Sequence, residues 1–97
     1  MKVSLTEEAE LELTEGARYY TRESDAQLGG AFISEFERCV ELLRQYPEFG
    51  AKWRGSTRRL PFRRFPFNII YAVRPSELRI IAVAHQSRRP SYWRSRI

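Results

Sequence analysis

The spacing of the apolar residues changes once along this chain, at Pro47, and this change constrains the fold more than any other feature. Before Pro47, apolar residues recur every three or four positions, as they do on an amphipathic helix. After it, residues 67–73 alternate with a period of two, as they do on a β-strand. Helices followed by strands, rather than alternating with them, predict an α+β fold.

Two helices are expected ahead of Pro47. Thr6 is a suitable N-cap for the first, which is predicted to run from about residue 6 to about residue 23. Ser24 or Asp25 can cap the second, which is predicted to end at Tyr46 because proline cannot continue a helix and restricts the residue before it. The predicted apolar faces contain Ala9, Leu13, Ala17 and Tyr20 in the first helix, and Leu28, Phe32, Ile33, Phe36, Cys39, Val40 and Leu43 in the second. The short separation predicts a helical hairpin.

Strands are expected on both sides of this hairpin. Residues 2–5 form a candidate first strand, and residues 51–57 read as a loop. Three further strands are predicted at 58–61, 67–73 and 78–85, followed by a tail at 86–97 that forms a strap or a short helix. The expected architecture is therefore an N-terminal strand and a two-helix hairpin packed on an antiparallel sheet. With 97 residues, of which 42% are hydrophobic, the chain is expected to be one domain.

Charge is distributed unequally between the two halves. Residues 1–50 carry five Lys or Arg against eleven Asp or Glu, a net charge of −6. Residues 51–97 carry twelve basic residues against one acid, Glu77, a net charge of +11. Fifteen of the seventeen basic residues are arginine, whose planar guanidinium suits phosphates, carboxylates and aromatic faces. This pattern predicts an anionic partner for the second half; the alternative is a solvated surface with no partner.

Two arginine-rich segments are the candidates for that contact. The segment RRLPFRRFPFNIIYAV repeats the motif R-x-P-F, and the tail contains HQSRRPSYWR, in which arginines alternate with aromatic residues as in sites that bind phosphates and stack on bases. The candidate binding residues are Arg58, Arg59, Arg63, Arg64, Arg88, Arg89, Trp93 and Arg94. The two segments are expected to lie side by side as one basic rim.

The two neighbouring aromatic residues of the tail are expected to have different roles. Adjacent side chains of an extended segment point in opposite directions, and those of a helical turn diverge by about 100°. We expect Trp93 to be the inward anchor and Tyr92 to be the outward, functional ring. The alternative is that both rings pack on the sheet beneath a strap whose arginines face water.

Few side chains are suited to catalysis. His85, the only histidine, could act as a general base, or it could be a structural residue at a strand end. Cys39 lies in the helical stripe and is expected in the core, because the nearby Glu35 disfavours a thiolate. No metal or cofactor is expected, since ligand clusters and nucleotide-binding motifs are absent. No apolar run approaches the length of a membrane span, and a single cysteine fits a reducing compartment, so a cytoplasmic protein is expected.

The order of elements, the helix exit YPEFG, the segment RRLPFRRFPFNIIYAV and the segment IIAVAHQSRRPSYWRSR together resemble the RelE/ParE superfamily of toxins. The resemblance covers nearly the whole chain, so residues 1–97 are expected to be a single domain of this type. It implies the toxin of a type II toxin–antitoxin operon, neutralised by a cognate antitoxin with an acidic, partly apolar segment. Operator DNA would be contacted only through the antitoxin. The superfamily contains ribosome-dependent mRNA endonucleases, of RelE type, and inhibitors of DNA gyrase, of ParE type.

The resemblance to the nuclease branch rests on the tail. Arg88 and Tyr92 are similar in spacing to the arginine and tyrosine with which RelE-type enzymes stabilise the phosphate and move protons, and His85 would complete a catalytic set. Asn68, however, stands where these nucleases have a strand arginine, so one catalytic cation is missing.

Two further features favour the ParE branch. The step His-Gln-Ser at 85–87 is similar to ParE-type toxins. RelE-type nucleases bind ribosomal RNA through a lysine-rich helical face, whereas residues 20–46 contain three arginines beside five acids. Fewer phosphate contacts weaken association with RNA. Inhibition of DNA gyrase is therefore the preferred prediction, with mRNA cleavage on the ribosome as the alternative and an inactive or other binding module as a third.

Overall fold

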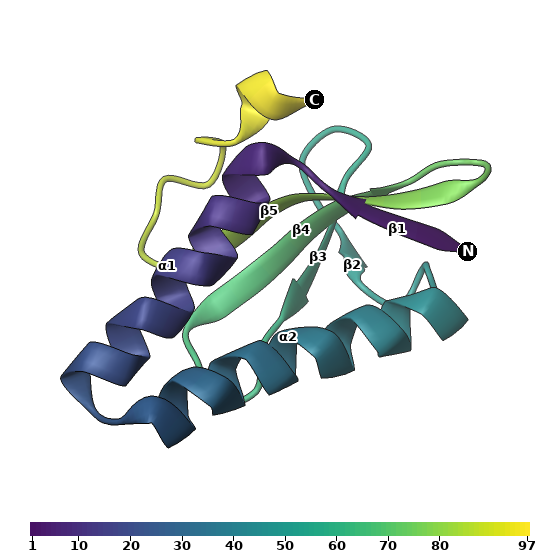
Figure 1. Cartoon of the computed structure of the whole chain (residues 1–97). Helices are drawn as coiled ribbons and strands as arrows, with labels where there is room; N and C mark the ends of the chain where they lie inside the picture. Colours follow the sequence, from purple (N-terminus) through teal and green to yellow (C-terminus); the bar gives the residue numbers. More distant parts are fainter.

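Two helices cover one face of a five-stranded sheet in the computed structural model, which describes residues 1–97 (Figure 1). The elements in chain order are β1 (Lys2–Leu5), α1 (Glu7–Glu23), α2 (Ala26–Gln45), β2 (Ala51–Lys52), β3 (Arg58–Pro61), β4 (Phe67–Val73), β5 (Glu77–His85) and a 3-10 turn, η1 (Arg94–Arg96). The predicted α+β class and order of elements are confirmed. No helix is long and apolar enough to cross a membrane.

The helix boundaries follow the capping residues. The Thr6 hydroxyl accepts a hydrogen bond from the Ala9 N–H at 3.0 Å, and the Asp25 carboxylate accepts one from the Leu28 N–H at 2.8 Å. Each bond satisfies one of the N–H groups that the first turn of a helix leaves without an intrahelical partner. Tyr46 caps the end of α2 directly before Pro47, as predicted.

The sheet has the strand order β1-β5-β4-β3-β2. The strands β2 to β5 pair antiparallel, whereas β1 lies parallel to β5, with Leu5 opposite Ile80. Parallel pairing requires a long crossover, and the intervening helices and strands supply it. The short strand β2, inside the segment expected to be a loop, pairs with Arg58 and Arg59, and its two residues are too few for a sequence pattern to reveal.

Both faces of the sheet are buried, each by a different part of the chain. The helices pack on one face, where Phe32 is fully buried among the aromatic rings of Tyr20, Phe62, Phe65 and Phe67. A register shift in the β4–β5 pairing places two consecutive residues, Ile81 and Ala82, in the cluster on the opposite face. The tail covers that second face.

Cys39 lies in the core between α2 and the sheet, with no exposed surface. Burial, together with the Glu35 carboxylate at 3.6 Å from its sulfur, raises the pKa of its thiol to about 12. The prediction that Cys39 is a core residue is confirmed.

Candidate binding site around the C-terminal tail

The tail folds back over the sheet face that the helices leave uncovered. Trp93 is its anchor: only 2% of the residue is exposed. Its ring packs in a cluster with Ile70, Ala72, Ile81, Ala82 and Ala84. The prediction that Trp93 points inward is confirmed. Because so little of the ring is exposed, a direct contact between Trp93 and a partner stays a prediction, restricted to the edge of the ring that lines a small hollow beneath the tail.

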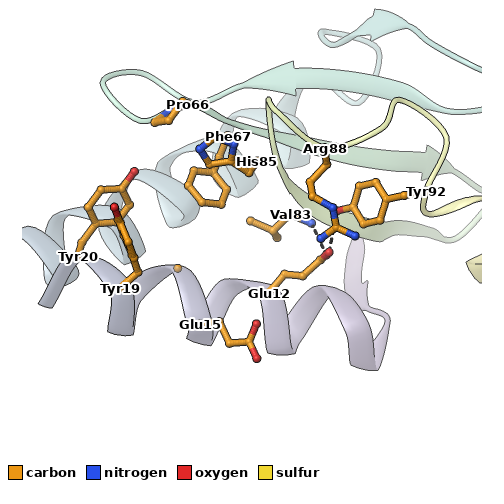
Figure 2. A pocket seen from close by; sticks show the side chains of 11 residues that line it. Glu12, Glu15, Tyr19, Tyr20, Pro66, Phe67, Val83, His85, Arg88 and Tyr92 are labelled. Carbon is orange, nitrogen blue, oxygen red and sulfur yellow. Dashed lines mark hydrogen bonds between the residues drawn. The ribbon is translucent and has the colours of Figure 1, made fainter. Parts of the chain in front are cut away.

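A single carboxylate on α1 attaches the tail to the rest of the fold. Glu12 Oε2 accepts hydrogen bonds from the Tyr92 hydroxyl at 2.7 Å and from Arg96 Nη2 at 3.1 Å. Its Oε1 accepts from Arg96 Nη1 at 2.8 Å and from the Val83 N–H at 3.1 Å. Figure 2 shows Glu12 extending toward Tyr92 and Val83, whereas Glu15 points away from them. One side chain therefore joins α1, β5 and the tail.

Glu12 and Arg96 were not among the residues predicted from the sequence. One signal was available for Glu12, since it lies three residues after Ala9 and four before Gly16, both of which are buried. An acid on the inward edge of an apolar helical stripe requires partners, because a buried charge is costly unless it is paired. The sequence does not indicate that the partners come from residues 92 and 96.

The Val83 N–H is available to Glu12 because β1 is shorter than β5. The pairing of β1 ends with Leu5 opposite Ile80, where the chain turns into α1, so the outer edge of β5 beyond Ile80 has no neighbouring strand. Side chains occupy part of this edge instead. The Thr6 hydroxyl and Arg96 Nη1 donate to the Ile81 carbonyl at 3.0 and 3.2 Å.

Tyr92 is held on three sides. The guanidinium carbons of Arg88 and Arg96 lie 3.9 and 4.9 Å from the centre of its ring, and its hydroxyl donates to Glu12. Burial raises the pKa of the phenol above its usual value, and the hydrogen bond to Glu12 raises it further. Tyr92 was predicted to be the outward, functional ring; it is instead half-buried, with its hydroxyl bonded to a carboxylate of the same chain, and its functional role stays a prediction.

A hollow of about 520 Å³ lies between α1 and the end of β5, and we call it the α1 groove (Figure 2). It is lined by Glu12, Glu15, Gly16, Tyr19, Tyr20, Pro66, Phe67, Val83, His85, Arg88 and Tyr92. The three candidate catalytic residues, His85, Arg88 and Tyr92, thus meet at one hollow. His85 Nδ1 accepts a hydrogen bond from the Ser87 N–H at 3.0 Å, so in the neutral ring the proton lies on Nε2.

A second, smaller hollow of about 120 Å³ lies between the tail and the sheet, and we call it the basic pocket. It is lined by Trp53, Arg59, Asn68, Ile70, Ala84, His85, Gln86, Arg88, Arg89, Pro90, Tyr92 and Trp93. Three arginines and no acid contribute to this lining. The guanidinium carbon of Arg59 lies 3.9 Å from the centre of the Trp53 ring. Trp53 was not among the residues predicted to bind a partner.

The four arginines before β4 do not form one rim with the tail, and that expectation is wrong. Neighbouring strand residues face opposite sides of a sheet, so Arg58 and Arg59 diverge. Arg58 donates to the carbonyl oxygens of Glu48 and Gly50, at 3.0 and 2.8 Å, whereas only Arg59 reaches the basic pocket.

Arg63 and Arg64 lie beside α2, away from the basic pocket. The Arg63 N–H donates to the Glu35 carboxylate at 2.6 Å, and this bond ties the turn before β4 to the helix. The hydrogen bonds that Glu35 accepts from Arg38, and the one from Arg63, hold its pKa below the usual value. Arg94 is exposed in η1, so of the predicted binding arginines only Arg59, Arg88 and Arg89 converge on one pocket.

Comparisons with known proteins identify the family. Residues 3–90 match the family model of the ParE toxin of the type II toxin–antitoxin system parDE. A chain of a solved structure described as the chromosomal ParDE TA system from P. aeruginosa superposes with a TM-score of 0.76 at 20% identity, covering 88% of this chain and 95% of that chain. At that identity the structural similarity shows the fold alone. A comparison with curated proteins gives no match. Because the family model spans nearly the whole chain, the protein belongs to the ParE toxin family of type II toxin–antitoxin systems.

Proposed function

We propose that this protein inhibits DNA gyrase in the cytoplasm when it is free, and that a cognate antitoxin with an acidic, partly apolar segment neutralises it. One observation carries the choice of gyrase over mRNA. The Tyr92 hydroxyl, which a RelE-type nuclease would need for proton transfer, donates to Glu12 at 2.7 Å and has a raised pKa. A phenol held in this way is a poor proton carrier near neutral pH. Asn68, in place of an arginine, weakens the nuclease reading further.

A second candidate function, mRNA cleavage on the ribosome, is supported by a specific observation. His85, Arg88 and Tyr92 line one groove, so a general base, a phosphate-binding cation and a phenol are close together. This route requires the bond between Tyr92 and Glu12 to open when RNA binds.

A supercoiling assay separates the two candidates. The purified protein is expected to block supercoiling of relaxed plasmid by purified gyrase, and to leave mRNA intact on purified ribosomes. Arg88→Ala and Tyr92→Phe serve as nuclease tests, because neither should unfold the protein. Arg88 is exposed, and Tyr92→Phe removes only a hydroxyl group. Cleavage of mRNA by the wild type that both substitutions abolish would overturn the gyrase proposal in favour of the nuclease.

The charge distribution predicts how the antitoxin associates. An acidic segment is attracted to the basic half, so the association rate should fall as salt rises. Removing a charge near the tail, in Arg89→Gln, should reduce that dependence. The matched control is Arg74→Gln on the β4–β5 turn, where Arg74 pairs with Glu77 at 3.6 Å. Stopped-flow rates between about 0.05 and 0.5 M salt provide the measurement, within the range where screening changes strongly. Rates that do not change with salt, or an antitoxin footprint confined to α1 and α2, would contradict the prediction.

A further inference from the structure

We propose that the basic pocket binds a single carboxylate from an acidic side chain of a protein partner, and that Arg59, stacked on Trp53, is the residue that holds it. That the carboxylate comes from an antitoxin rests on the proposed function. That the pocket binds a carboxylate is argued from the pocket itself, independently of that function.

The first support is an unsatisfied donor. Arg59 Nε is buried and has no hydrogen-bond partner, and it is the only buried side-chain nitrogen or oxygen in the chain of which this is true. Buried polar groups in native proteins are nearly always paired, because an unpaired donor forfeits the hydrogen bonds that it makes in water. Because Arg59 also lines the basic pocket, its unpaired N–H points to an acceptor that would arrive with a ligand.

The second support is the fixed orientation of this arginine. In the β3–β4 pairing Arg59 lies opposite Ile70, which belongs to the cluster on the tail side of the sheet. Trp53 then lies against the guanidinium, with 3.9 Å between the guanidinium carbon and the centre of the ring. Stacking occupies a face of the guanidinium and leaves its in-plane N–H donors free. The side chain is thus positioned before any ligand arrives.

The same chain shows how such a guanidinium binds a carboxylate. Arg38 donates from Nε to one oxygen of Glu35 and from Nη2 to the other, both at 2.8 Å. This side-on geometry uses the nitrogen that is orphaned in Arg59. Two parallel charge-assisted bonds of this kind are among the stronger hydrogen bonds in proteins.

The size and lining of the basic pocket restrict the ligand. Its volume of about 120 Å³ is enough for a carboxylate or a phosphate group. Arg59, Arg88 and Arg89 make it electropositive, and no acid lines it. Ile70, Ala84 and Trp93 provide apolar walls, and removing a singly charged carboxylate from water costs less there than removing a doubly charged phosphate monoester. The acidic segment of the proposed antitoxin would supply such a carboxylate.

Arginine side-chain NMR tests the proposal on the complete protein. The probe is a short capped peptide of glutamate, with the glutamine peptide of the same length as its control, and the Nε–H signal of Arg59 is followed. The glutamate peptide should shift this signal and the glutamine peptide should not. Arg59→Lys keeps the charge but lacks the planar pair of donors, so it should weaken peptide binding about tenfold. The matched control, Arg74→Lys, should bind as the wild type does.

Two results would overturn the proposal. Inorganic phosphate that shifts the Arg59 signal at lower concentration than the glutamate peptide would make this a phosphate pocket, suited to nucleic acid. No response of the signal to either probe would make the Arg59–Trp53 pair a structural feature only. The wild-type signal decides both points even if Arg59→Lys folds poorly. If the antitoxin fails to bind the wild type, the proposed neutralisation is wrong, while the titration still decides what the pocket binds.

Discussion

Replacing Trp93 with alanine is expected to lower the free energy of unfolding by about 3–5 kcal/mol, as is typical for a buried tryptophan. Trp93 is 2% exposed and covers the sheet face that has no helix on it. Removing the ring exposes Ile70, Ile81 and their neighbours, so the loss is not confined to one side chain. Domains of this size are stable by about 5–15 kcal/mol, so the change removes a large part of the total. Chemical denaturation followed by far-UV circular dichroism measures it.

Two substitutions in the same tail are controls for this measurement. Tyr92→Phe keeps the ring between its two arginines and removes only the hydroxyl that donates to Glu12, so the cost should be about 0.5–1.5 kcal/mol. Arg94→Ala removes an exposed side chain and should change stability by less than about 0.5 kcal/mol. If Trp93→Ala is as stable as Arg94→Ala, the tail does not lie on the sheet in solution.

Replacing Glu12 with alanine is expected to cost about 3–5 kcal/mol, although the substitution is on a helix where a surface glutamate would be nearly neutral. The side chains of Glu12 and Arg96 are only 16% and 12% exposed. Without the carboxylate, Arg96 keeps a largely buried charge with no counter-ion, and the Tyr92 hydroxyl and the Val83 N–H lose their acceptor. Thermal and chemical unfolding measure the loss of stability. Hydrogen exchange at Val83 should become faster.

The neighbouring Glu15 offers a matched control for Glu12. It lies on the same helix and points away from the tail (Figure 2), so Glu15→Ala should change stability by less than about 0.5 kcal/mol. Adding Arg96→Met to Glu12→Ala should recover part of the loss, because the unpaired charge is then removed as well. Equal stability of Glu12→Ala and Glu15→Ala would show that the contacts of Glu12 with the tail do not hold the fold together.

Features that depend only on neighbouring residues can be predicted from the amino-acid sequence. The helices begin at Thr6 and Asp25 because these side chains cap the helix ends, and α2 ends before Pro47 because proline cannot continue it. Apart from the two-residue β2, the strands of the second half follow from their sequence patterns. Trp93 could be predicted as the inward anchor because it is large, apolar and adjacent to a polar-tipped ring. The resemblance to the toxin family, which the comparisons confirm, also comes from the sequence alone.

Which charged side chains meet, in contrast, depends on how the chain folds in three dimensions. Glu12 joins Tyr92 and Arg96 across 80 and 84 residues of chain, and Arg59 lies on the tail side of the sheet with its guanidinium stacked on Trp53. Charge–charge contacts depend on distances of a few ångströms, and sequence composition carries no information about such distances. The prediction of one basic rim was wrong for most of the arginines, because only Arg59, Arg88 and Arg89 line the basic pocket. Strand alternation places Arg58 on the other side of the sheet, and the bond to Glu35 on α2 holds the turn at Arg63, so only three arginines line the basic pocket.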